Sequence, residues 1–375
     1  MWKFPAAVIG VFVVGYLLIN GLPSFEAAPV APRPIVLGFI GPLTGDGANL
    51  GQHSKAAVEL ATDEVNAAGG IHGRPLQFIY EDGGCNATTT TIGATKLISA
   101  DKVSVILGGA CASEAAALAS LAEQSRTVAF SYCSSAAALS AAGDYVFRNY
   151  PSDTSQGLFA AQYIADTLKK SKIAVLYVNT DWGVAIKNIF KSEFKKKDGI
   201  IVAEEKFEYS SRDFRTVLAK IKAKKPQLLY MLGYTDESIA ALKQAAELKF
   251  VIPFFGSTAW DDPKIFAAAG KIANGAMYPV VSSSLNDEFR AKMQAKIGSD
   301  DIFACSPNAY DAVHLLARVI KQAGTGATAI KNELYKTVYL GGVSMPEVRF
   351  DDHGDLVGEP YVVMVAKDGK AEERK

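Results

Sequence analysis

The chain has 375 residues, of which 49% are hydrophobic and 21% charged, and its formal net charge is +0. This length suggests two to three domains, and the composition is that of a globular protein with a substantial core. The balanced charge argues against a nucleic-acid partner, because a phosphate-binding surface needs an excess of lysine and arginine.

The first 34 residues are unlike the remainder of the chain. Lys3 precedes an uncharged apolar run over residues 4–22, which is the layout of a signal peptide or a signal anchor. Because the run is about long enough to span a bilayer, it either is cleaved after export or remains as a transmembrane helix that holds the protein to the membrane. Residues 26–34 are rich in alanine and proline and predict a stiff tether. We therefore expect an extracytoplasmic protein, periplasmic or on the cell surface.

Apolar β-rich runs alternate with amphipathic helices after the tether. The first series predicts strands at residues 35–41, 76–81, 103–107 and 127–132, and helices at 51–68, 88–100 and 114–124. The second series predicts strands at residues 173–178, 200–204, 228–232 and 254–256, and helices at 184–197, 213–223 and 237–248. Such alternation implies right-handed crossovers and a parallel sheet covered on both faces, so the two series predict two doubly wound α/β lobes.

The last part of the chain departs from this alternation. It predicts helices at residues 286–297, 307–323 and 329–338, followed by a hairpin of two β-rich runs at 348–351 and 361–366. We expect the chain to cross between the lobes several times here, which forms a multi-strand hinge. The predicted boundaries are residues 35–152 and 283–334 for lobe 1, residues 153–282 and 335–367 for lobe 2, and residues 368–375 for a charged tail.

Motifs of known enzymes and metal sites are missing from the sequence. There is no G-x-S-x-G, H-E-x-x-H or Walker A motif, so we expect no enzymatic activity. The four histidines have no metal-ligand spacing, and residues 351–355 lack the later acidic ligand of an EF-hand loop. The four cysteines form no C-x-x-C pair, whereas the oxidising compartment of an exported chain permits disulfides. We expect no cofactor and no metal.

Several runs carry a resemblance to a known family. They are residues 35–45 (IVLGFIGPLTG), 66–76 (NAAGGIHGRPL), 80–82 (YED) with Cys85, 106–109 (ILGG) with Cys111, 307–312 (PNAYDA) and 350–355 (FDDHGD). With these runs the chain resembles the type I periplasmic binding proteins that serve branched-chain amino-acid and amide transporters. The resemblance extends over residues 35–367, and it is more specific for the class than for the ligand.

The resemblance implies a mechanism and partners. Members of the family bind a small solute between two lobes, which close around it in the manner of a Venus flytrap. The resemblance therefore implies a non-enzymatic protein that captures a small polar ligand, an amino acid or a related amide or carboxylate, and delivers it to an ABC permease. The alternative is a ligand-sensing protein, similar to receptor ectodomains, that feeds a separate signalling partner.

The cysteines and one serine near them have implied roles. In the family a disulfide near the ligand joins cysteines at the positions of Cys85 and Cys111, and two buried free thiols are the alternative here. Cys133 and Cys305 either form a second bridge or stay unpaired. Ser113 precedes the predicted helix at 114–124, so its hydroxyl caps the helix, faces a ligand carboxylate at the helix N-terminus, or does both. Relatives carry this serine one residue earlier, directly after the matching cysteine.

Polar residues that follow the strand at 127–132 form the second half of the predicted lobe 1 site. Cys133, Ser134 and Ser135 stand at the carboxyl end of that strand, which is where parallel sheets bind ligands. The resemblance implies that Cys133 binds the ligand through its backbone and that Ser135 takes the place of a ligand-binding threonine.

Lobe 2 is expected to supply aromatic side chains that cover the ligand and a carboxylate that pairs with a ligand ammonium. Trp182 and Tyr234 follow strands, at positions where relatives carry aromatics that cover the ligand. Thr258 stands where relatives that bind leucine-type amino acids carry a glutamate for the ligand ammonium. Because an ammonium in a dry site needs a carboxylate, Asp261 or Asp236 is the candidate partner. The ligand thus remains open between an amino acid, an amide, a urea-like compound and a carboxylate.

Overall fold

The structure is a computed structural model that describes residues 32–45, 47–282, 285–298, 302, 305–358 and 361–374. The predicted signal peptide or anchor falls almost entirely on residues 1–31 and so lies outside the described residues. Among the residues described, no helix combines the length and apolar character that a membrane span requires. The chain separates into Met1–Arg33 and Pro34–Lys375, and the elements below all belong to the second unit.

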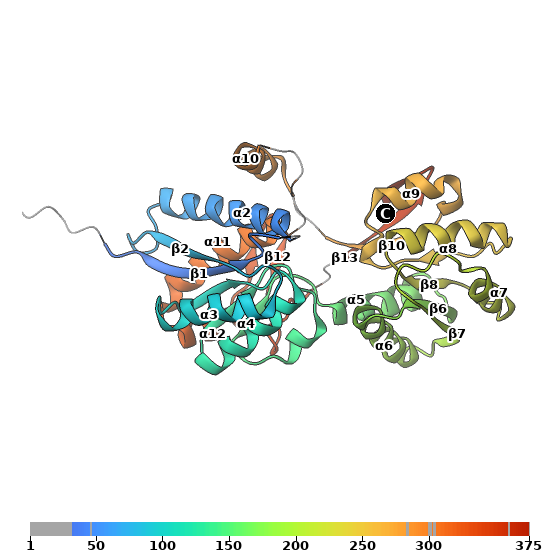
Figure 1. The fold of residues 1–375 in the computed structure, drawn as a ribbon, viewed down its shortest axis with the longest axis horizontal. Coiled ribbons are helices and arrows are strands. Elements are labelled where there is room, and N and C mark those ends of the chain that lie inside the picture. Colours follow the sequence, from blue (N-terminus) through green and yellow to red (C-terminus); the bar gives the residue numbers. More distant parts are fainter. Residues whose placement is uncertain are drawn as a thin grey trace, which may run out of the picture. The chain divides into compact units, whose positions relative to one another are not determined.

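Five parallel strands form the sheet of lobe 1, in the order β2-β1-β3-β4-β5 (Figure 1). They are β1 (Ile35–Gly41), β2 (Leu76–Asp82), β3 (Val105–Gly108), β4 (Val128–Ser131) and β5 (Val146–Arg148). Alternate residues of β3 enter different cores, Val105 and Leu107 on one face and Ile106 on the other. Both faces are therefore apolar, as expected of a buried parallel sheet.

Helices cover both faces of this sheet. One face packs against α3 (Ala87–Ser99) and α4 (Ala112–Ser125), and the other against α2 (Ala48–Ala67), α11 (Ser306–Ala323) and α12 (Ala327–Leu334) (Figure 1). α10 (Asp287–Ile297) packs beside α2. α2 ends just before Gly69 and Gly70, whose φ angles of 95° and 68° are of the left-handed kind that glycine adopts at helix ends.

Seven strands form the sheet of lobe 2, in the order β14-β13-β10-β9-β8-β6-β7. The parallel strands are β6 (Lys172–Val178), β7 (Ile200–Phe207), β8 (Leu229–Leu232), β9 (Phe254–Phe255) and β10 (Met277–Val281). Two antiparallel strands, β13 (Tyr361–Lys367) and β14 (Lys370–Glu373), complete the sheet beside β10. The two doubly wound α/β lobes predicted from the sequence are thus confirmed.

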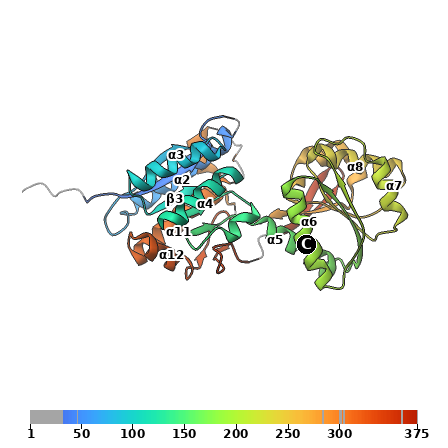
Figure 2. The ribbon, with the colours of Figure 1, turned by 60° about the horizontal axis from the view of Figure 1, so that its bottom comes forward.

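Helices also cover both faces of the second sheet (Figures 1 and 2). α5 (Asp153–Gln162), its π-helical continuation η2 (Tyr163–Thr167) and α6 (Asp181–Lys196) cover one face. α7 (Arg215–Ala223), α8 (Thr235–Glu247) and α9 (Pro263–Ala269) cover the other. Short 3-10 turns η1 (Ala137–Ala141), η3 (Thr258–Trp260) and η4 (Gly270–Ala273) follow β4, β9 and α9.

The predicted C-terminal hairpin is wrong. β12 (Glu347–Val348) pairs with β11 (Tyr339–Leu340), whereas β13 pairs with β10 and β14. Residues 368–375 were expected to be a charged tail, but β14 occupies residues 370–373 of them, after a turn at Asp368 and Gly369. Pairing with β10 buries Tyr361 and Val363 against lobe 2, a gain that a two-stranded hairpin in water would not provide.

Residues 339–356 pack into lobe 1, although the predicted boundary assigned residues 335–367 to lobe 2. Val348 and Phe350 belong to the core that covers the α11 face of the first sheet. Asp311 on α11 fixes this segment, because its carboxylate accepts the backbone N–H groups of Val343 at 2.9 Å and Ser344 at 2.7 Å. The chain passes between the sheets after β5, after β10 and before β13, so three crossings connect the lobes.

Candidate ligand-binding site

A cavity of about 480 Å³ lies at the carboxyl end of β4. We call it the Ser135 cavity. Lobe 1 lines it with the loop of residues 133–138 and with Ala110 and Ala112 beside the start of α4. Asp153 on α5 and Asp181, Trp182 and Ala185 on α6 complete its lining. Its volume lies in the range of small-molecule sites, and its place at strand tips is where parallel sheets bind ligands.

Asp153 is the buried charged group of the Ser135 cavity. Its side chain stands on the first turn of α5, and only 7% of the residue is exposed. Burial raises the pKa of Asp153 to about 6, while hydrogen bonding by Ser135 and Trp182 and the charge of Arg148 act in the opposite direction. The carboxylate is thus held between the two side chains that the sequence assigned to the ligand from opposite lobes.

Arg148 fixes the loop that carries Ser135. The guanidinium is 1% exposed and donates to the carbonyl of Ala136 at 2.7 Å and to that of Ser134 at 3.4 Å. Its Nε donates to Asp355 Oδ1 at 2.6 Å, and Ser140 donates to the other carboxylate oxygen at 2.6 Å. Because the arginine is neutralised by Asp355 and its donors are committed, it orients the loop and is not offered to a ligand.

Two disulfides hold the loops around the Ser135 cavity. Cys85 and Cys111 are joined across the tips of β2 and β3, with their Cα atoms 5.3 Å apart. Cys133 and Cys305, which the sequence left open, form a second bridge with a Cα separation of 5.4 Å. The second bridge ties the ligand loop to the residue before α11, 172 positions later in the chain.

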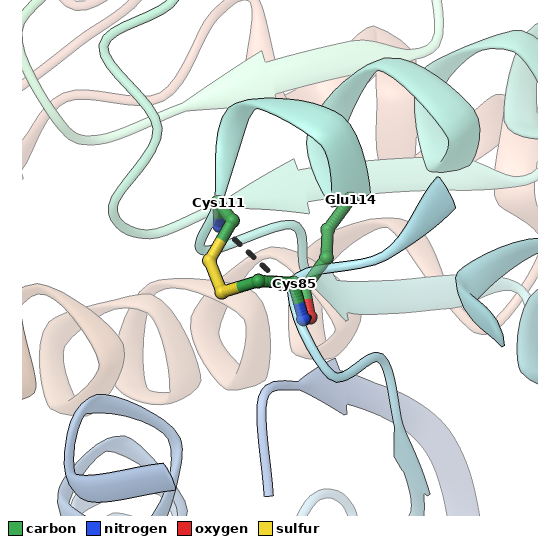
Figure 3. Close-up of side chains that lie close together, drawn as sticks. All are labelled: Cys85, Cys111 and Glu114. Carbon is green, nitrogen blue, oxygen red and sulfur yellow. Dashed lines mark hydrogen bonds between the residues drawn. A yellow bond between two sulfur atoms is a disulfide. The ribbon is translucent and has the colours of Figure 1, made fainter. Parts of the chain in front are cut away.

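Glu114 lies beside the first disulfide and completes a cluster that has metal-ligand chemistry (Figure 3). Its carboxylate accepts the N–H groups of Cys85 at 2.9 Å, Ala110 at 3.1 Å and Cys111 at 3.3 Å. Burial outweighs these bonds and raises the pKa of Glu114. Because both sulfur atoms belong to the disulfide, no thiolate remains to ligate zinc, and the cluster organises the loop rather than a metal.

Aromatic side chains of lobe 2 stack beside the Ser135 cavity. The rings of Trp182 and Tyr234 are 5.0 Å apart and 23° from parallel, and Tyr209 meets Tyr234 edge-on at 5.7 Å. Tyr234 and Tyr209 line a neighbouring polar hollow of about 720 Å³. Trp182 was predicted in a loop before its helix, but α6 begins at Asp181, so the indole stands on the first helical turn.

A second, smaller cavity of about 230 Å³ holds the other two residues predicted in lobe 2. We call it the Asp261 cavity, because Asp261 and Thr258 line it together with Tyr150 and residues of α11 and of the 339–356 segment. Desolvation and the neighbouring charge of Asp262 raise the pKa of Asp261. Thr258 connects this cavity to α5, since its backbone N–H donates to Gln156 Oε1 at 2.9 Å.

The structure brings together some of the predicted site residues and separates others. Cys133, Ser134, Ser135 and Trp182 line the Ser135 cavity. Ser113 lines none of the three hollows: its hydroxyl donates to the Cys85 carbonyl at 2.7 Å, and Ala112 stands at the cavity wall instead. The predicted cap at Ser113 is also wrong, because α4 starts at Ala112 with Cys111 as N-cap.

Sequence reasoning missed Asp153 and Arg148. Asp153 follows Ser152, which caps α5, and an acidic residue on a first helical turn is common without any functional role. Arg148 is the last residue of the short strand β5, and a polar residue at a strand end gives no hint of a functional role. The one signal in the sequence was that Arg148 and Asp153, both charged, lie close to the predicted boundary between the lobes. Hydrophobic periodicity assigns no role to such charges.

Two α/β lobes joined by three crossings, with hydroxyls, aromatics and a buried carboxylate at their strand tips, define a type I solute-binding protein. The periplasmic binding protein family matches residues 34–370, and the chain belongs to this family. Family members are extracytoplasmic, non-enzymatic proteins that serve ABC transporters, so the expectation that the chain is not an enzyme is confirmed.

Individual relatives agree with this assignment. The leucine-, isoleucine-, valine-, threonine- and alanine-binding protein of Pseudomonas aeruginosa is 26% identical over 356 residues, 91% of this chain and 92% of that protein. The solved substrate-binding protein LivJ of Streptococcus pneumoniae in complex with isoleucine is 26% identical, with a TM-score of 0.69 over 91% of this chain and 99% of that one. The Desulfitobacterium hafniense substrate-binding protein in complex with Leu shares the fold at 22% identity, with a TM-score of 0.74 over 91% of this chain and 100% of that one.

Proposed function

We propose that this protein captures a zwitterionic amino acid in the Ser135 cavity, closes its lobes around it and delivers it to an ABC permease. The observation that carries the proposal is a buried carboxylate, Asp153, in a cavity whose lining, as far as the chain is described, contains no lysine, arginine or histidine. A desolvated carboxylate of this kind favours a cation as its partner, and the ligand ammonium is that cation.

The carboxylate of the ligand needs hydrogen-bond donors of another kind. The Ser135 hydroxyl already donates to Asp153, so the donors are the backbone N–H groups at the start of α4 beside Ala112, at the positive end of a 14-residue helix. The charge of Arg148 acts on Asp153, but its guanidinium is paired with Asp355 and is not among the described residues that line the cavity. This arrangement favours a zwitterion over a plain carboxylate, which would meet Asp153 without a positive charge.

Trp182 belongs to the wall that lobe 2 contributes to the Ser135 cavity, and Tyr234 stacks on it from the neighbouring hollow. Their stacked rings offer a large apolar surface for the rest of the ligand, and Trp182 also interacts with Asp153. A ligand that touches Ser135 from lobe 1 and Trp182 from lobe 2 has additional contacts when the lobes are closed, so it shifts the population toward that state. A permease can then distinguish the loaded protein by its conformation.

The proposed location is extracytoplasmic, with residues 1–34 exporting or anchoring the protein. Two disulfides that join all four cysteines support it, because such bonds persist in oxidising compartments. N-terminal sequencing of the mature protein, together with its partition between membrane and soluble fractions, distinguishes a cleaved signal from a retained anchor.

Calorimetric titration of the ligand-stripped protein tests the proposal. The ligands are L-amino acids, each with two analogues of the same side chain, one lacking the amino group and one lacking the carboxylate. We expect binding of the zwitterion only, and a loss of about tenfold or more in Asp153→Asn, with Asp181→Asn in the same cavity as the control. Equal binding of the analogue without an amino group, or no amino acid bound at all, would contradict the proposal.

A further inference from the structure

The Asp261 cavity has a wall of hydrogen-bond acceptors that the proposed function does not use. Apart from Asp261 itself, its polar lining includes Asn308 and Ser344, both of which are buried. Asn308 Nδ2 donates to the Asn149 carbonyl at 2.8 Å, and the Ser344 hydroxyl donates to Asp311. The Ser344 hydroxyl and one N–H of the Asn308 amide are thus committed inside lobe 1, so the two side chains present their oxygen atoms and at most one N–H to a ligand.

The remaining polar atoms of the cavity do not change the excess of hydrogen-bond acceptors in its lining. The Thr258 N–H donates to Gln156, so it is also committed, and the hydroxyls of Tyr150 and Ser282 can act as donors or acceptors. Among the described residues, no lysine, arginine or histidine lines the cavity. Asp261 is therefore a carboxylate that meets no positive charge from the protein in this cavity.

Tyr150 lines the Asp261 cavity and lies three residues before Asp153, which lines the Ser135 cavity. It lies on the crossing between β5 and α5. Burial raises the pKa of Tyr150, and the negative charges of both Asp153 and Asp261 contribute, so the phenol lies within electrostatic range of the two carboxylates. Gln156, one turn after Asp153 on α5, makes the bond to Thr258. The two cavities are thus neighbours on either side of the first turns of α5.

We infer that the Asp261 cavity receives the end of the ligand's side chain, and that this end is a hydrogen-bond donor, an amide NH2 or a cation. The inference rests on the proposed function, in which Asp153 holds the α-ammonium. A volume of about 230 Å³ accommodates a side-chain terminus of a few heavy atoms, given that a water molecule occupies about 30 Å³ in the liquid. Leu285 and Ile302 provide apolar surface for the methylene groups.

An apolar side chain fits this cavity less well for a physical reason. It would displace water from the Asp261 carboxylate without replacing the lost hydrogen bonds, and a desolvated, unpaired carboxylate is costly. A side chain that ends in a carboxylate would meet acceptors and a like charge. The lining therefore selects against both leucine-like and glutamate-like ligands.

Titration of the ligand-stripped protein with four L-amino acids of similar length tests this inference. Glutamine supplies an amide donor, lysine a cation, glutamate an acceptor and norleucine an apolar end. We expect glutamine or lysine to bind about tenfold or more tightly than norleucine, with glutamate the weakest. The order of the first two ligands distinguishes an amide site from a cation site.

Variants attribute the preference to one carboxylate. Asp261→Asn should lose about tenfold or more in affinity for the preferred ligand while its affinity for norleucine stays within about threefold. Asp262→Asn is the matched control, because that carboxylate accepts from the Thr235 hydroxyl and the Lys264 N–H and does not line the Asp261 cavity. The wild-type order of ligands decides the question by itself if Asp261→Asn does not fold.

The outcomes separate this inference from the proposed function. Tighter binding of norleucine than of glutamine and lysine, or an equal loss for all ligands in Asp261→Asn, would overturn the side-chain assignment while leaving amino-acid capture intact. Failure of the wild-type protein to bind any amino acid would overturn both.

Discussion

Replacement of Asp153 by asparagine should make the empty protein more stable while it weakens ligand binding about tenfold or more. The folded protein holds the Asp153 proton up to about pH 6, whereas the unfolded chain releases it near the ordinary value of 3.8. Between these values the folded state binds more protons, so the free energy of unfolding falls as the pH rises through this window. At neutral pH the full cost of the buried charge remains.

The size of this cost follows from the same pKa. A rise from 3.8 to about 6 corresponds to at most about 3 kcal/mol. Asp153→Asn keeps the shape of the side chain and lacks the charge, so it should recover a large part of that free energy at pH 7.5. With an unfolding entropy of about 2.1 cal/mol/K per residue, the full gain would raise the Tm by about 4 °C.

Denaturant unfolding and calorimetry of ligand-stripped protein at pH 4 and pH 7.5 measure the effect. Removal of bound ligand is essential, because a ligand that binds only the folded state stabilises wild type and masks the gain. Asp181→Asn, an exposed carboxylate on the same cavity, serves as the control. A gain of equal size at both pH values would show that packing and not charge is responsible, and a loss at pH 7.5 would refute the reasoning.

Other predictions concern ligand binding and the structures that hold the site. Because the ligand ammonium pairs with ionised Asp153, the Kd for an amino acid should rise as the pH falls below about 6, and titration of Asp153→Asn should show no such dependence. Replacing Cys133 and Cys305 by serine should lower the free energy of unfolding by about 1–2 kcal/mol more than replacing Cys85 and Cys111, since the two disulfides close loops of 172 and 26 residues. Denaturant unfolding that found the reverse order would contradict this loop-entropy account. Arg148→Met should lower the free energy of unfolding by about 3–5 kcal/mol by leaving Asp355 without its partner, and a change below about 1 kcal/mol in the same assay would show that the pair is dispensable.

Much of the fold could be predicted from local sequence patterns. The apolar runs of β1, β6 and β8 are too short for helices and are flanked by amphipathic helices, which is typical of buried parallel strands. The glycine pair after α2 and the acceptor side chains before α5 and α6 mark helix ends, because capping chemistry acts within a few residues. Long-range pairing has no such local signal.

The C-terminal strands illustrate that limit. Residues 348–351 and 361–366 are both β-rich and separated by a turn, so a hairpin is the local expectation. In the structure β13 pairs instead with β10, about 80 residues earlier in the chain, and the intervening segment packs on lobe 1. The choice depends on which sheet has an apolar edge to complete, and that edge exists only when the lobe has folded.

The candidate site divides in the same way. Ser135 and Trp182 follow predicted strands, so the topology of a parallel sheet was sufficient to place them at a ligand site. Ser113 had the same local signal, but its hydroxyl donates to the Cys85 carbonyl from a neighbouring loop. Whether such a hydroxyl faces a ligand or a carbonyl depends on a contact 28 residues away in the chain.

The alternation of most strands and helices in this protein followed from its sequence alone, because apolar periodicity depends on neighbours within a few residues, although β5, α5 and β10 had no predicted counterpart. Only the tertiary structure decided that Asp153 is buried between Ser135 and Trp182, that Cys133 bonds to Cys305, and that Asp261 faces acceptors. Desolvation and the pairing of distant groups arise when segments far apart in the chain meet, and the burial of the Asp153 carboxylate depends on both.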